Sequence, residues 1–149
     1  MTERRRSERM QPVQRIAGER AQAAARRYAE RRENLNQETE QLAQLRGFRR
    51  EYEQKLTASG QNGIDAYRLR DYNAFISRID RAIEQQKTSV SRLEEEVESL
   101  RQDWLQHWGN ARALDQLVER YQRDERRAAD AREQKRNDEL AQRGGGRQR

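Results

Sequence analysis

The chain has 149 residues, of which 39% are charged and only 32% are hydrophobic, so it can form one domain at most and cannot bury a thick globular core. The single proline and the frequent Arg, Gln, Glu, Ala and Leu favour helix nearly throughout, and such a composition is typical of coiled coils. The absence of cysteine excludes disulfides and thiolate metal sites. No stretch approaches the ~20 apolar residues that a membrane span needs.

The chain begins with an arginine-rich segment, residues 1–11, which we predict to be flexible and which no apolar signal core follows. A first amphipathic helix is predicted over residues 12–56, because apolar or small residues recur there at heptad-like spacing. These residues would form the seam that packs against a partner helix, and Arg31 and Glu38 interrupt it. Its members are Val13, Ala17, Ala21, Ala24, Tyr28, Leu35, Leu42, Leu45, Tyr52 and Leu56.

Residues 57–66, TASGQNGIDA, contain Gly60, Asn62 and Gly63 and are predicted to form a loop. Asp65 is predicted to be the N-cap of a second helix over residues 67–143. The heptad seam of this helix is more regular, which favours a coiled coil over disorder. Its two series are Leu69, Ile76, Ile83, Val90, Val97, Trp104, Ala111 and Val118, and Tyr72, Ile79, Gln86, Leu93, Leu100, His107, Leu114 and Tyr121.

Two adjacent amphipathic helices with a short connection fold back on each other. The predicted fold class is therefore all-α, a two-helix antiparallel coiled-coil hairpin over residues 12–143 with a longer second helix. Past Tyr121 the seam positions become charged, as at Glu125 and Arg132, which predicts a bare charged helix and then a flexible tail over residues 144–149.

Charge is uneven along the chain: residues 1–32 carry a formal charge of +6, residues 33–119 of −4 and residues 120–149 of +4. A hairpin brings the two basic terminal segments to one end. Acidic residues are interleaved there and aromatic residues are few, so a solvated face or a protein contact is favoured over nucleic-acid binding.

Catalytic chemistry has few candidate residues. The only histidine, His107, lies between Trp104 and Trp108 and is interpreted as a packing or surface residue, because no base or nucleophile is identified beside it. There is no glycine-rich phosphate loop and no cluster of ligand-forming residues. The sequence therefore predicts no enzyme activity, no cofactor and no metal.

On either side of the loop, more helix positions are apolar than the two per heptad that a coiled-coil seam needs. One set on each helix has the spacing 4, 3, 4, and the two sets match as antiparallel neighbours. They are Gln41, Leu45, Phe48 and Tyr52 on the first helix, and Phe75, Ile79, Ala82 and Gln86 on the second. Spacing alone leaves open whether they thicken the core or form an exposed docking patch.

Three segments carry a family resemblance: EYEQKL before the loop, NGIDAYRLRDYNAFISRIDRAIEQQ from the loop into the second helix, and QKRNDELAQR near the end. They resemble the FliJ family of flagellar export proteins over most of residues 40–143. The resemblance implies a component of the flagellar type III export apparatus with a fold similar to the coiled-coil stalk of rotary ATP synthases. A virulence-system stalk protein, or a structural or nucleic-acid-binding coiled coil, is the alternative.

The resemblance also implies partners. Such a protein binds the hexameric export ATPase and promotes its ring assembly, contacts the cytoplasmic region of the membrane export-gate protein and handles export chaperones. It is expected to bind no ATP, to be monomeric alone, and to lie in the cytoplasm, peripherally associated with the inner membrane at the flagellar base. The gate-contacting surface of the family matches the two sets above, with Phe48 where tyrosine is usual and Gln86 where histidine can occur.

Overall fold

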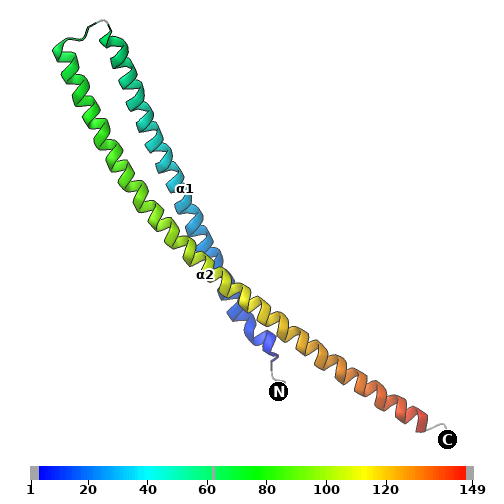
Figure 1. Ribbon diagram of the computed structural model, residues 1–149. Helices are drawn as coiled ribbons and strands as arrows, with labels where there is room; N and C mark the ends of the chain where they lie inside the picture. Colours follow the sequence, from blue (N-terminus) through cyan, green and yellow to red (C-terminus); the bar gives the residue numbers. More distant parts are fainter. Residues whose placement is uncertain (1–3, 62, 147–149) are drawn as a thin grey trace. The chain divides into compact units, whose positions relative to one another are not determined.

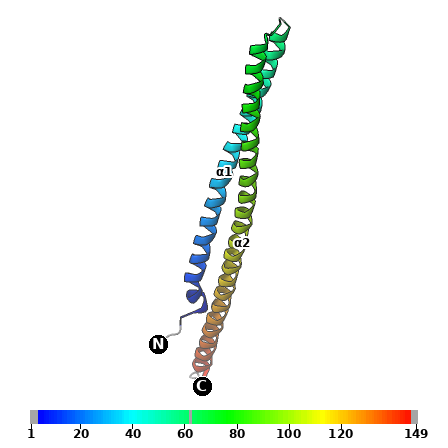
Figure 2. The same ribbon diagram turned by 90° about the vertical axis from the view of Figure 1, so that its left-hand side faces the viewer.

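The computed structural model describes residues 4–61 and 63–146, which form two long helices and no strand. Helix α1 spans Arg6–Gly60 and helix α2 spans Ala66–Gly146 (Figures 1 and 2). The predicted all-α hairpin with a longer second helix is confirmed. Neither helix contains, among the described residues, an apolar stretch long enough to cross a membrane.

Both helices are longer than the sequence predicts. Helix α1 begins at Arg6 rather than at residue 12, and it ends at Gly60 rather than at residue 56, while α2 continues to Gly146 rather than ending at residue 143. Pro12 lies inside α1. A proline has no backbone N–H, so α1 continues through Pro12 without the hydrogen bond that this position would otherwise donate to the Glu8 carbonyl. The flexibility of the two ends stays a prediction, and residues 1–3 and 147–149 lie outside the described residues.

The connection between the helices uses glycine and aspartate for different reasons. Gly63 adopts a positive φ of 80°, which L side chains rarely adopt, and its N–H donates a hydrogen bond of 3.3 Å to the Gly60 carbonyl. The Asp65 carboxylate accepts hydrogen bonds from the N–H groups of Tyr67, at 2.8 Å, and Arg68, at 3.0 Å. The predicted N-cap is therefore confirmed.

The chain divides into two compact units. We call Ala24–Trp104 the loop unit, and the described parts of Met1–Ala23 and Leu105–Arg149 the terminal unit. Each contains a segment of α1 and a segment of α2.

A thin apolar cluster forms the core of the loop unit. Leu42 of α1 lies with Ile79, Ile83 and Val90 of α2, and Leu35 and Leu45 pack against them. Polar pairs between the helices flank this seam at Arg27–Asp103, Arg31–Glu96 and Arg49–Asp80. Such pairs favour one antiparallel register over its alternatives.

The terminal unit has less apolar core. Val118 and Ser7 are its buried residues in the described part of the chain. The Gln14 side-chain amide donates a hydrogen bond of 2.7 Å to Asp115. Beyond Glu125, residues 126–145 of α2 are all exposed. This segment, the overhang, extends about 30 Å at ~1.5 Å per residue, in agreement with the charged seam positions of the sequence.

Candidate partner-binding surfaces

The residues predicted to contact the export gate all lie in the loop unit, but they differ in exposure. Ile79 is only 9% exposed and belongs to the apolar core, and Leu45 packs against that core. Ala82 and Gln86 are half-buried. The exposed members are Gln41, Phe48, Tyr52 and Phe75. Some members of the set therefore belong to the core and others to the surface, and docking by the exposed members stays a prediction.

Three of the four exposed members are aromatic, and the half-buried Tyr72 stacks on one of them. The ring of Tyr52 on α1 stacks on Phe75 of α2 with centroids 4.1 Å apart, and it also stacks on Tyr72 with centroids 5.8 Å apart. Phe48, one turn before Tyr52, is 59% exposed. We call Phe48, Tyr52, Tyr72 and Phe75 the aromatic patch. Aromatic rings present a large, stiff contact area, so this patch suits apolar or aromatic side chains of a protein partner.

Gln86 makes an intrachain contact. Its side-chain amide donates a hydrogen bond of 2.9 Å to the Glu38 backbone carbonyl and a second hydrogen bond to the Glu38 carboxylate. Glu38 is one of the two residues that interrupt the apolar seam of the first helix. The contact explains the interruption, because a polar pair inside a seam specifies register.

An ion pair lies one residue from Phe48. The Arg49 guanidinium donates from Nε to Asp80 Oδ1 at 2.5 Å, and it also pairs with Glu53 on its own helix. The hydrogen bond to Asp80 raises the pKa of Arg49 above its usual value, and the nearby charges of Asp80 and Glu53 act in the same direction. Apolar periodicity does not predict this pair. The signal that could have predicted this ion pair is the presence of opposite charges next to the seam, at positions that face each other when the helices are aligned antiparallel.

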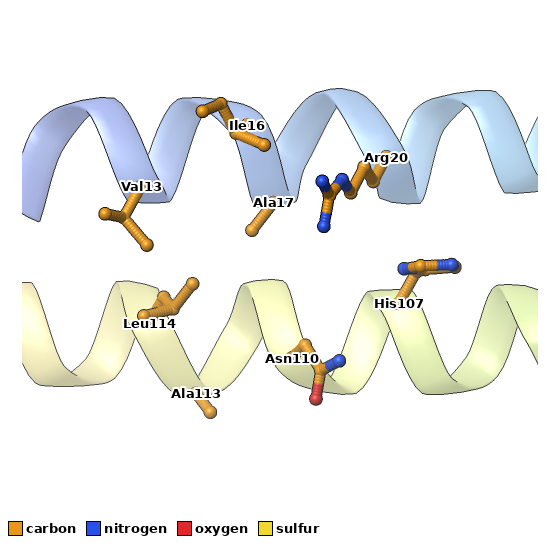
Figure 3. A pocket seen from close by; sticks show the side chains of 8 residues that line it. All are labelled: Val13, Ile16, Ala17, Arg20, His107, Asn110, Ala113 and Leu114. Carbon is orange, nitrogen blue, oxygen red and sulfur yellow. The ribbon is translucent and has the colours of Figure 1, made fainter.

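The terminal unit contains a groove between α1 and α2 with a volume of about 490 Å³. In Figure 3, Val13 of α1 lies opposite Leu114 of α2, and Arg20 lies opposite Asn110 and His107. Ile16, Ala17 and Ala113 complete its lining. Val13 is 46% exposed, so it is not the buried seam residue that the sequence predicts. His107 lies at the helix interface, half-buried, and lines this groove.

A polar contact links the start of α1 to α2 in the same unit. The Ser7 hydroxyl and the Ser7 backbone N–H both donate hydrogen bonds to the Glu125 carboxylate. The hydroxyl contributes most to lowering the pKa of the Glu125 carboxyl, and the N–H and the charge of Arg5 add to the effect, while partial burial opposes it. The sequence carries no signal for this contact, because the heptad pattern marks Glu125 only as a charged interruption of the seam.

The described surfaces consist of apolar side chains and charged groups. In the part of the chain that the structure describes, no three His, Asp or Glu side chains come together to hold a metal ion. The aromatic patch, the groove and the basic overhang offer apolar area and charge, which are the elements of protein–protein recognition.

Comparison with known proteins identifies the family. The family model described as flagellar FliJ protein matches residues 6–149. The flagellar FliJ protein of Salmonella typhi is 31% identical over 120 residues, which cover 80% of this chain and 82% of that protein. The flagellar FliJ protein of Escherichia coli K12 is 29% identical over 128 residues, which cover 86% and 87%. No solved structure matches the chain significantly. The chain therefore belongs to the FliJ family of flagellar proteins.

Proposed function

We propose that the protein is a non-enzymatic component of the flagellar type III export apparatus. It binds the hexameric export ATPase, promotes assembly of the ATPase ring and couples it to the export gate and to export chaperones. Nucleotide hydrolysis belongs to the ATPase in this scheme. The family match over nearly the whole chain supports the flagellar system over a virulence secretion system.

The overhang is the feature that supports the proposed contact with the ATPase. Helix α2 continues to Gly146, and residues 126–145 are exposed on every side, with a surplus of basic over acidic side chains. An isolated helix in water is marginally stable, and a helix without an apolar face gains little from packing within its own chain. Its surface is therefore available to a ring of protein subunits.

The ATPase contact is tested by phosphate release from the purified export ATPase with and without the full-length protein. We expect the protein to raise the rate of ATP hydrolysis, to release no phosphate alone, and to shift the sedimenting ATPase toward hexamers. Unchanged hydrolysis together with no co-sedimentation would refute this part of the proposal.

The gate contact is proposed for the residues that the family resemblance marks: Gln41, Leu45, Phe48, Tyr52, Phe75, Ile79, Ala82 and Gln86. The exposure of Phe48 and the stacking of Tyr52 on Phe75 support a direct role for the aromatic patch. The core position of Ile79 supports a role in holding that patch in place.

The gate contact is tested by binding of the full-length protein to the purified cytoplasmic region of the gate protein. We expect Phe48→Ala to weaken this binding and to leave ATPase stimulation unchanged. Ala58→Ser, a change at another exposed position of α1, is the matched control and should alter neither. Loss of both activities in Phe48→Ala would contradict the assignment of separate surfaces.

The proposed location is the cytoplasm at the flagellar base, in peripheral association with the inner membrane through the gate. Fractionation of cells that express a tagged full-length protein tests it. The membrane-bound share should fall when the gate protein is absent. An unchanged share would contradict association through the gate.

A further inference from the structure

We propose that the groove of the terminal unit binds an amphipathic helix of a partner protein, and that a carboxylate of this helix pairs with Arg20. The groove is lined by Val13, Ala17 and Arg20 from α1 and by Asn110 and Leu114 from α2 (Figure 3). It shares no residue with the surface proposed for the export gate. The inference goes beyond the proposed function and does not depend on it.

The apolar part of the groove is exposed. Val13 and Ile16 are each 46% exposed, although both are large aliphatic residues on the helix that packs against α2. Val13, Ile16 and Arg20 are separated by three and four residues, so they form a row along one side of α1. A row with this spacing beside a second helix is the receptor geometry for a third helix, whose side chains at the same spacing fit between the two.

The charge of the groove indicates what the third helix carries. Arg20 is the only acidic or basic residue among those that line the groove, apart from the imidazole of His107. Within the described residues, Arg20 makes no ion pair and no hydrogen bond. An exposed guanidinium at the edge of apolar surface is well placed to recognise a carboxylate.

The heptad pattern shows why Arg20 lacks an acidic partner. Arg27, one heptad after Arg20, pairs with Asp103 of α2 at 3.6 Å. The position of α2 one heptad after Asp103 is Asn110, which lies opposite Arg20. Arg27 thus faces the carboxylate of Asp103, whereas Arg20 faces the neutral amide of Asn110. A partner helix can supply the missing carboxylate.

Charge favours a partner protein over a second copy of this chain. The groove lies in the segment of α1 with a surplus of basic residues, since residues 1–32 carry a formal charge of +6. A symmetric dimer through this groove would bring two such segments, with Arg20 on each, toward one another. Like charges at an interface oppose association.

The test uses the full-length protein and two fluorescein-labelled, hydrocarbon-stapled helical peptides. Both peptides carry leucines at alternating spacings of three and four, and they differ only in a glutamate or a lysine beside the leucine row. Fluorescence anisotropy should show the glutamate peptide binding about tenfold more tightly, because one peptide gains an ion pair with Arg20 and the other meets a like charge. Arg20→Glu should reverse the preference, and Ile16→Ser should weaken binding of both peptides.

Arg15→Glu is the matched control, since it makes the same change of charge at an exposed position of the same helix that does not line the groove. It should leave the preference in place. Because the chain has no cysteine, Ala113→Cys can carry a single environment-sensitive dye at the groove, and its emission should shift when the glutamate peptide binds. Circular dichroism of each variant checks that the helices are intact.

Equal binding of the two peptides, a preference that Arg20→Glu does not alter, or no binding of either peptide would overturn the proposal. Sedimentation supplies the remaining outcome. A concentration-dependent dimer of the wild-type protein that Ile16→Ser abolishes would mean that a second copy occupies the groove, which also overturns the proposal.

Discussion

The Ser7 hydroxyl of α1 donates a hydrogen bond of 2.7 Å to the Glu125 carboxylate of α2, and the Ser7 backbone N–H donates another of 3.1 Å to the same carboxylate. Amides in the first turn of a helix have no intrahelical acceptor. Glu125 therefore caps α1 from the opposite helix. It also joins the start of α1 to the last residue before the overhang, so this contact lies near the end of the two-helix part of the terminal unit.

Removal of this cap should fray the start of α1. We expect Glu125→Ala to raise the hydrogen exchange rates of Met10 and Gln11 several-fold, because the first turn of α1 loses the acceptor that holds Ser7 in place. Exchange measured by NMR or mass spectrometry checks this. Asp124→Ala, at the neighbouring exposed position, is the control and should leave those rates unchanged. Equal rates in all three proteins would contradict the capping role.

The same contact predicts a pH dependence. The pKa of the Glu125 carboxyl is lower in the folded protein than its usual value, chiefly because of the Ser7 hydroxyl. A carboxyl with a depressed folded pKa contributes stability above its ordinary pKa, and this contribution is lost as the pH falls through the folded pKa. The start of α1 should therefore loosen only in acid. Carbon NMR titration of Glu125 should give a higher pKa in Ser7→Ala than in the wild type, and identical values would count against the contact.

Local and periodic features of the fold could be predicted from the sequence. The Asp65 cap depends on residues two and three positions away, and the core at Ile79, Ile83 and Val90 follows from a regular heptad. The Ser7–Glu125 contact joins residues 118 positions apart, and neither side chain belongs to an apolar pattern. Its prediction would have required the register of α1 against α2 at a place where the seam is weakest.

In the proposed gate surface, residue spacing does not predict which side chains are buried and which are exposed. The spacing 4, 3, 4 places residues on one helical face, but that face includes both the seam and its edge. Ile79 and Phe75 share the pattern, yet Ile79 is 9% exposed and Phe75 is 38% exposed. Heptad spacing likewise assigns Val13 to the seam, yet Val13 is exposed. The rotation of each helix about its axis decides these cases, and it depends on how both helices pack.

Close packing at Ala24 gives a prediction about stability. Ala24 is 1% exposed, the lowest value in the core. We expect Ala24→Leu to lower the free energy of unfolding by about 1–3 kcal/mol, because extra methylene groups in a packed core force side chains and backbone to move. Thermal unfolding followed by circular dichroism checks this. Ala29→Leu adds the same atoms at an exposed position of the same helix and should change stability by less than about 0.5 kcal/mol.

Substitutions at two members of the proposed gate surface should differ in their effect on stability. Ile79→Ala removes core atoms and should lower the free energy of unfolding by about 2 kcal/mol or more. Phe48→Ala removes a ring that is 59% exposed and should leave the unfolding transition nearly unchanged. A large loss of stability in Phe48→Ala would indicate that its ring belongs to the core.

Removal of the overhang should affect ATPase stimulation but not the stability of the rest of the protein. Residues 126–145 are exposed throughout, so they add little apolar burial to the rest of the protein. Truncation after Arg126 should leave the melting temperature of the remaining helices nearly unchanged, and it should lower or abolish stimulation of the export ATPase. A truncation after Leu140 is the milder control. If the shorter protein melts at a lower temperature, the overhang stabilises the hairpin; if it stimulates the ATPase fully, the ring contact lies elsewhere in the chain.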